Sequence, residues 1–168
     1  TKMRSLFLEK GTFHSKVVPG KEEAGIKYKD YFDWTEPVKS IPSHRILAIR
    51  RGEKEEMLWM DIQPPEDEAV VLLENLFVKG NNESTQQVKL AIADGYKRLL
   101  KPSMETEIRL FTKKKADEEA IRVFAENARQ LLMAAPLGQK RTMAIDPGFR
   151  TGCKVVCLDE QGKLLEYT

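Results

Sequence analysis

Apolar residues recur at helical spacing through about the first 135 residues of the chain, which leaves few alternatives to a helical fold. The clearest stripe occupies positions i, i+3, i+4, i+7 and i+8 of one helix face: Ala69, Leu72, Leu73, Leu76 and Phe77. Pro65 suits the first turn of this helix, and Gly80 follows its last turn. We therefore predict a helix here with one buried face.

Weaker stripes predict further helices on either side of this one. Ser84 followed by Gln87 is a capping-box pattern for the next helix, which Pro102 is expected to stop. Two more stripes follow between Ser103 and Leu132, and their spacing does not decide between one long helix and two. Before Pro65 the sequence favours a helix over residues 1–10, a helix that opens at position 42 or 43 and closes at Gly52, and an isolated strand over Met57–Ile62. The segment 22–34 is ambiguous, because the spacing of Tyr28, Tyr31 and Phe32 fits a helix while their aromatic character fits a strand, and we favour the helix.

The pattern changes near Pro136 and Gly138, where short strand-like segments replace the helical stripes. Three segments predict strands joined by tight turns: Arg141–Ile145, Val155–Leu158 and Lys163–Tyr167. A ribbon of this size is marginal without another layer to pack on. We therefore predict a mainly α fold, with a multi-helical domain over residues 1–137 and a short antiparallel β-meander over 141–168 that begins an α/β domain. Because the meander is incomplete and the chain starts at Thr1 rather than Met, we expect a piece of a longer protein.

Composition excludes several classes of protein. The longest apolar runs have five residues, whereas a membrane span needs about 20. Lys and Arg number 28 against 26 Asp and Glu, so the net charge of +2 excludes a polycation. Cys153 and Cys157 lie about 13 Å apart in an extended strand and cannot form a disulfide with each other. We expect buried thiols in a reducing compartment, and therefore a cytoplasmic protein with no membrane partner.

Asp146 is the first candidate for chemistry, because it follows a predicted buried strand and precedes Pro147 and Gly148. In RNase H-like folds an acid at this place holds a divalent cation together with acids from later strands, which predicts Asp146 as a metal ligand. The segment also fits a phosphate-binding hairpin of the kind found in actin and sugar-kinase folds, or a plain turn. Arg150 and Lys154 suit either functional interpretation.

Clusters of cations are the second candidate, since Lys and Arg contact the phosphates of nucleic acids. The predicted nucleic-acid-binding residues are Arg45, Arg50, Arg51, Lys113, Lys114, Lys115, Arg150 and Lys154. A solvated helix face, or a helix C-terminus whose dipole favours cations, explains such clusters without a ligand. No Ser or Cys nucleophile with a base and an orienting group is identifiable, so we predict no catalytic residue.

Several motifs, taken in order, resemble one family over nearly the whole chain. They include Ser15-Lys16-Val17-Val18, Lys29-Asp30-Tyr31-Phe32-Asp33, Ile41-Pro42-Ser43-His44-Arg45, Met104-Glu105-Thr106-Glu107, Ala134-Ala135-Pro136 and Asp146-Pro147-Gly148-Phe149-Arg150-Thr151-Gly152. In this order they resemble the Tex family of bacterial transcription accessory proteins. The last motif resembles the first strand of that family's YqgF-type, RNase H-like domain.

The resemblance implies a central helical region followed by the first strands of the YqgF-type domain. It implies a nucleic-acid-binding scaffold in transcription, with RNA or DNA bound through the full-length protein and RNA polymerase or other transcription machinery as a further partner. The family's helix-hairpin-helix units and oligonucleotide-binding barrel, its expected main nucleic-acid contacts, have no counterpart among the motifs above. Two alternatives stay open: an RNase H-like nuclease or resolvase, and a module that docks on the transcription machinery. We expect no cofactor, except Mg or Mn at Asp146 if the chain belongs to a nuclease.

Overall fold

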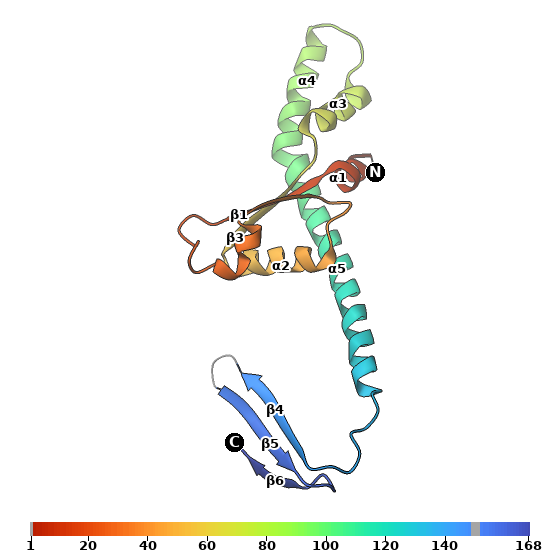
Figure 1. The fold of residues 1–168 in the computed structure, drawn as a ribbon. Coiled ribbons are helices and arrows are strands. Elements are labelled where there is room, and N and C mark those ends of the chain that lie inside the picture. The colour runs from red at the N-terminus through yellow and green to blue at the C-terminus, as the bar shows by residue number, and fades with distance from the viewer. Residues whose placement is uncertain (1, 149–151) are drawn as a thin grey trace. The chain divides into compact units, whose positions relative to one another are not determined.

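The structure, a computed structural model, describes residues 2–148 and 152–168 of a chain that divides into two compact units, Thr1–Ala125 and Glu126–Thr168. The first unit runs through α1 (Lys2–Lys10), β1 (Thr12–Val17), η1 (Ile26–Tyr31), β2 (Asp33–Pro37), α2 (Ser43–Lys54), β3 (Leu58–Gln63), α3 (Glu66–Phe77), α4 (Glu83–Gly95), η2 (Tyr96–Leu100) and most of α5 (Lys101–Leu132) (Figure 1). The second unit holds the last turns of α5, then β4 (Thr142–Gly148), β5 (Gly152–Leu158) and β6 (Leu164–Tyr167). The predicted fold class, mainly α with a β-meander, is confirmed.

An antiparallel three-stranded sheet, in the order β2-β1-β3, lies in the middle of the first unit. The register pairs Ser15 of β1 with Trp34 of β2 and with Met60 of β3. Only β3 corresponds to a predicted strand, and its prediction as an isolated strand is wrong because β1 pairs along its whole length. The missing strands are five and six residues long, so their alternation is too short to stand out from the surrounding loops.

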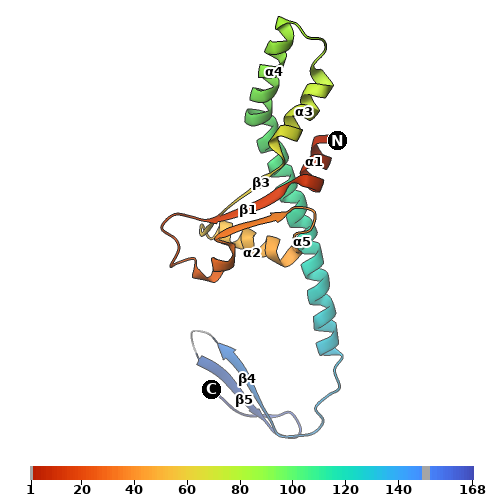
Figure 2. The ribbon, with the colours of Figure 1, turned by 45° about the horizontal axis from the view of Figure 1, so that its top comes forward.

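One face of this sheet carries the hydrophobic core. Phe13, Leu58 and Ile62 are fully buried on it, and α2 lies against it (Figure 2). Ile46 and Ile49 of α2 belong to the same buried cluster as Phe13 and Ile62. The core therefore consists of a sheet face and the helices that cover it, rather than of helices alone.

Gly52 was expected to close the helix that starts near position 42, but α2 continues to Lys54 and contains it. A Cβ atom at position 52 would lie 2.6 Å from the Cδ1 atom of Leu58, which is buried. The glycine therefore allows close packing between α2 and β3 rather than ending the helix.

The segment 22–34 does not form the predicted regular helix. It forms the short 3₁₀ helix η1, followed by the strand β2. Tyr28 is buried against the core side, while Trp34 and Tyr31 meet edge to face with ring centroids 5.9 Å apart. The aromatic residues of this segment are thus divided between the two states: Tyr28 and Tyr31 lie in η1, and Trp34 lies in β2. Whether residues 33 and 34 form a strand depends on their pairing with β1, and β1 lies outside this segment of the sequence.

Pro102 does not stop the preceding helix, because α4 continues through η2 into α5 (Figure 1). The segment η2 is a π-helical turn of five residues directly before Lys101 and Pro102. A π turn widens the helix by one residue, so the ring and missing N–H of the proline are accommodated without a break. Tyr96 opens this turn as a buried residue, and burial raises the pKa of its hydroxyl to about 12, so the group stays neutral.

The cap of α4 lies two residues before the predicted one. Asn82 is the N-cap, its side chain accepts a hydrogen bond from the Thr85 backbone N–H at 2.9 Å, and the Thr85 hydroxyl accepts one from the Asn82 N–H at 3.2 Å. The two residues form a reciprocal capping box. The two stripes after Ser103, which the pattern left open, form the single 32-residue helix α5.

The second unit is an antiparallel meander in the order β4-β5-β6, as predicted. The strand β4 continues through Asp146 to Gly148, so Asp146 lies within a paired strand instead of following it. Within residues 2–148 and 152–168, no helix combines the length and the apolar character that crossing a membrane requires.

Candidate nucleic-acid interface

Arg45, in the first turn of α2, is held by groups of the protein itself. Its Nη1 atom donates to both carboxylate oxygens of Glu36, at 3.0 and 3.1 Å, and its guanidinium lies 4.8 Å from the centroid of the Trp34 ring. Glu36 and Trp34 are both on β2, so Arg45 fastens α2 to the edge of the sheet. A phosphate would have to compete with a carboxylate and an aromatic face for this side chain.

Arg50 belongs to a network of charges between α2, β3 and α5. It pairs with Glu53 at 2.6 Å, and Glu53 also pairs with Arg109 of α5. Arg109 further pairs with Glu105 at 3.1 Å and donates to the backbone carbonyl of Met60 at 2.9 Å. Two cations meet two carboxylates here, so the site has no surplus charge for an anion.

The groove beside this network has a volume of about 330 Å³ and is lined by Arg50, Pro102, Glu105, Thr106, Arg109 and Leu110. Sequence reasoning did not single out Arg109. The spacing of Glu105 and Arg109, four residues apart on a helix, is the signal that could have found their pair. The pairing with Glu53 has no such signal, since 56 residues separate the two.

Arg51 is exposed and forms a surface cluster at the C-terminal end of α2. Its Nε atom lies 3.0 Å from Glu55, and Lys27 lies 2.5 Å from the same carboxylate. Hydrogen bonds from Lys27 and Arg51 lower the pKa of Glu55 from its ordinary value of 4.5 to about 2. The cluster ties η1 to the end of α2 and leaves most of the Arg51 side chain in solvent.

The contribution of Glu55 to stability is expected to disappear in acid. A carboxyl group whose pKa is lowered by folding stabilises the native state above its unfolded pKa, and this stabilisation is lost as the pH falls from about 4.5 to about 2. The midpoint of urea unfolding should therefore be higher for wild type than for Glu55→Gln at neutral pH, and the difference should shrink below pH 4.5. A difference that persists unchanged to pH 2 would show that the carboxylate charge has no part in it.

The lysine run at residues 113–115 lies on one turn of α5, between the buried residues Thr112 and Ala116. Lys113 pairs with Asp117 at 2.5 Å and Lys114 approaches Glu118 at 3.9 Å, both four residues along the helix. Lys115 is exposed and has no ion pair among the described residues. Surface pairs of this kind contribute little, so all three ammonium groups remain able to exchange their partner for a phosphate.

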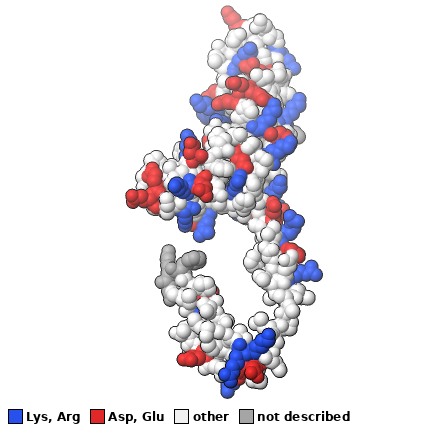
Figure 3. All heavy atoms as spheres, viewed as in Figure 1, with Lys and Arg blue, Asp and Glu red and all other residues white. Residues whose placement is uncertain are grey.

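The structure does not gather the predicted cations of the first unit into one patch. The side chains of Arg45, Arg50 and Arg51 on α2 each pair with a different carboxylate, and the lysine run lies on another helix, α5. On the face of this unit shown in Figure 3, Lys and Arg side chains alternate with Asp and Glu side chains. These residues stay predictions, with Arg51, Lys114 and Lys115 the most accessible of them.

In the second unit, Asp146 of β4 lies opposite Lys154 of β5, and both are exposed. Arg150 lies outside the described residues. Over residues 2–148 and 152–168, no three His, Cys, Asp or Glu side chains lie close enough together to hold a metal ion. The described residues therefore do not form a metal site around Asp146. Cys153 and Cys157 are free, as predicted, but Cys153 is exposed rather than buried.

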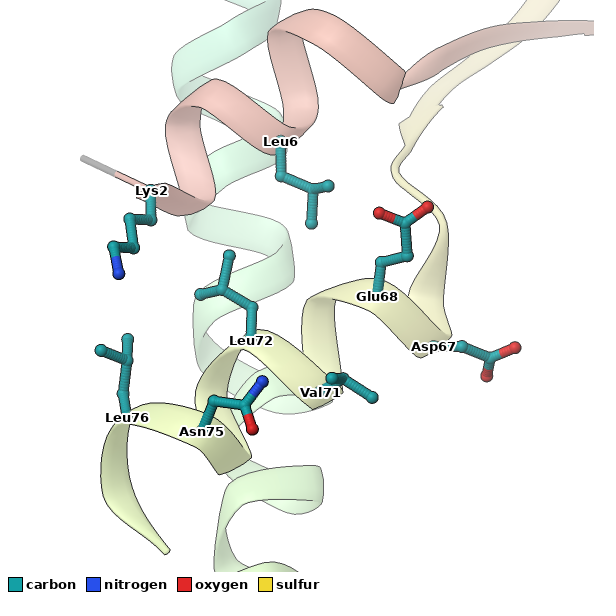
Figure 4. Close-up of a pocket in the computed structure, with 8 residues that line it drawn as sticks. All are labelled: Lys2, Leu6, Asp67, Glu68, Val71, Leu72, Asn75 and Leu76. Carbon is teal, nitrogen blue, oxygen red and sulfur yellow. The ribbon is translucent and has the colours of Figure 1, made fainter.

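A pocket of about 500 Å³ lies between α1 and α3 (Figure 4). Leu6 of α1 points toward the apolar side chains Leu72 and Val71 of α3, while Lys2, Asp67, Glu68 and Asn75 form a polar rim. The predicted apolar stripe of α3 is thus only partly buried: Ala69 is inaccessible, whereas Phe77 is 62% exposed. The arrangement can receive an apolar side chain but brings no reactive groups together.

Comparison with known proteins identifies both parts of the chain. Residues 1–124 match the model of the Tex central region-like family, and residues 140–168 match that of the Tex protein YqgF-like domain. The chain is 43% identical over 140 residues to the uncharacterised protein YdcI of Bacillus subtilis, covering 83% of the chain and 20% of the relative. It is 37% identical over 174 residues to protein YhgF of Escherichia coli and 35% identical over 175 residues to the transcriptional accessory protein Tex of Neisseria gonorrhoeae, in both cases covering 98% of the chain and 22% of the relative. The chain thus spans about a fifth of the length of these relatives.

Proposed function

This chain belongs to the Tex family of transcription accessory proteins, and from that premise we propose that it serves as a nucleic-acid-binding scaffold in transcription. The observation that carries the proposal is the match to the Tex central region over residues 1–124, followed in order by the match to the YqgF-like domain over residues 140–168. The proposal includes RNA or DNA and the transcription machinery as partners, and a cytoplasmic location.

The arrangement of charged side chains supports a scaffold. Several pairs join elements that are distant in sequence: Arg4 with Glu107, Lys10 with Glu68, Arg45 with Glu36 and Arg109 with Glu53. Most charged groups between elements are thus used to hold the helices and the sheet together. The exposed cations Arg51, Lys114 and Lys115 are left for phosphate contact.

Binding to nucleic acid should depend on salt and on the lysine run. We expect the chain to bind fluorescent single- and double-stranded RNA and DNA at low salt, with an affinity that falls as salt rises, because phosphate contacts release counterions. Replacing Lys113, Lys114 and Lys115 together by Gln should weaken binding and reduce the slope of log K against log salt by up to about 2 for a single strand. Fluorescence anisotropy measures both quantities.

The matched control replaces Lys2, Lys54 and Lys79 by Gln, which changes the net charge equally on exposed side chains that form no ion pair among the described residues. It should retain most of the wild-type affinity. A full-length protein that binds none of the four nucleic acids at low salt contradicts the proposed function. Equal losses in both triple variants would mean that net charge, and not the lysine run, governs binding.

A metal-dependent nuclease or resolvase is the second candidate, favoured by the YqgF-like match that includes Asp146. Cleavage of branched or hybrid substrates with Mg²⁺ or Mn²⁺, compared between the wild-type and Asp146→Asn forms of a protein that holds the whole domain, distinguishes the two candidates.

A further inference from the structure

The sheet of the first unit has a second face, opposite the core, on which the described residues are polar apart from one proline and one large aromatic residue. Alternation along the strands places on it Thr12, His14 and Lys16 of β1, Asp33, Thr35 and Pro37 of β2, and Trp59, Asp61 and Gln63 of β3. The core side chains of the same strands point the other way, toward α2. The aromatic residue is Trp59, whose indole is 76% exposed.

Trp59 stands next to a cation. Lys16 is its direct partner in the register between β1 and β3, so the two side chains leave the same face about 5 Å apart at Cβ. Lys16 is exposed and forms no ion pair within the described part of the chain. An exposed aromatic face beside an ammonium group matches one nucleotide, whose base is a flat π system and whose phosphate is an anion.

Polar groups continue along the same face in the next rows. His14 lies between Asp61 and Thr35, its Nε2 atom is 2.8 Å from the Thr12 hydroxyl, and its Nδ1 atom is 3.3 Å from the Thr35 hydroxyl. The Gln63 amide donates to the Asp61 carboxylate. These side chains already hydrogen-bond to one another, and they lie in the rows of the face next to Trp59, where they could exchange a partner for the polar edge of a base.

We propose that this sheet face, defined by Trp59, Lys16, His14, Asp61 and Gln63, binds single-stranded nucleic acid by stacking a base on Trp59. The inference rests on the proposed function, and it specifies the strandedness and the site. A duplex keeps its bases stacked on each other, so only a single strand can present a base to the indole.

The charges on the face predict how it binds. Lys16 is opposed by Asp33 and Asp61, so the face cannot neutralise a row of phosphates. Stacking must then supply most of the affinity of this face, and the face must add little to the salt dependence that the lysine run gives the chain. One phosphate contact corresponds to a slope of about −0.7 for log K against log salt on a single strand.

Intrinsic fluorescence tests the proposal directly, because the chain has two tryptophans and only Trp59 is largely exposed. In a Trp34→Phe background, titration with oligo(U) or oligo(dT) should quench the Trp59 emission. In the wild-type background, Trp59→Ala should weaken binding of the same oligonucleotides about 5- to 150-fold by anisotropy, the range expected for losing one stacked base. Trp59→Phe should recover part of the loss, since it keeps a ring.

Phe77→Ala is the matched control, since Phe77 is also an exposed aromatic residue, 62% accessible, but lies on α3. It should bind like wild type. Wild-type affinity in Trp59→Ala, or equal binding of duplex and single strand through Trp59, overturns this inference and leaves the proposed function standing. If no oligonucleotide binds to this chain at low salt while acrylamide still quenches Trp59, the inference fails, whereas the proposed function fails only if the full-length protein does not bind either.

Discussion

Replacing Phe13 by Ala is expected to lower the free energy of unfolding by about 3–5 kcal/mol. Phe13 is fully buried on β1, the central strand of the sheet, and belongs to the main core cluster. Removing its ring loses the transfer free energy of the buried atoms and leaves a cavity between the sheet and the helices. Urea unfolding followed by circular dichroism measures the change, and the expected loss is a large share of the stability of a domain of this size.

Phe77→Ala serves as the reference for this experiment. The same atoms are removed from a side chain that is 62% exposed on α3, so the change should stay within about 0.5 kcal/mol. Similar losses in the two variants would mean that the sheet face is not the centre of the core.

Replacing Arg109 by Ala is expected to cost about 2–3 kcal/mol of unfolding free energy. The change deprives the carboxylates of Glu53 and Glu105, which are 27% and 21% exposed, of their shared partner. It also removes the donor to the Met60 carbonyl on β3, an edge strand. The loss should be larger than for an ordinary surface pair because three elements, α2, β3 and α5, depend on one side chain.

Two further variants separate the causes. Arg98→Ala breaks a pair with Asp94 in which the two side chains are 66% and 61% exposed, and it should change stability far less than Arg109→Ala does. Arg109→Lys keeps the positive charge but not the planar fork that reaches three acceptors, so it should recover only part of the loss. If Arg98→Ala costs as much as Arg109→Ala, the network does not join the elements as the geometry indicates.

Local spacing predicted the helices well where burial and propensity agree. The stripe that starts at Ala69 became α3, and the three segments after Gly138 became the meander. It failed at Pro102, because a proline rule assumes a regular α-helix and the chain forms a π turn before it. It failed again for residues 22–34, whose state depends on a strand that is distant in sequence.

The same difference between local pattern and distant contact applies to the candidate site residues. The sequence identifies Arg45 as a cation but does not show that Glu36 and Trp34 contact it, nor that Arg109 reaches Glu53. These contacts form between different elements, whereas the pair of Arg50 with Glu53 lies within one helix and has a local i,i+3 spacing.

What the sequence determined by itself is the helical character of the chain from Glu66 to Leu132, the strands after it and the family, because periodicity and motif order are properties of neighbouring residues. Tertiary structure alone decided that β1 pairs with both β2 and β3, that Arg109 joins three elements, and that Trp59 faces solvent beside Lys16. The reason is that burial and pairing belong to two segments at once, and each depends on where the rest of the chain comes to lie.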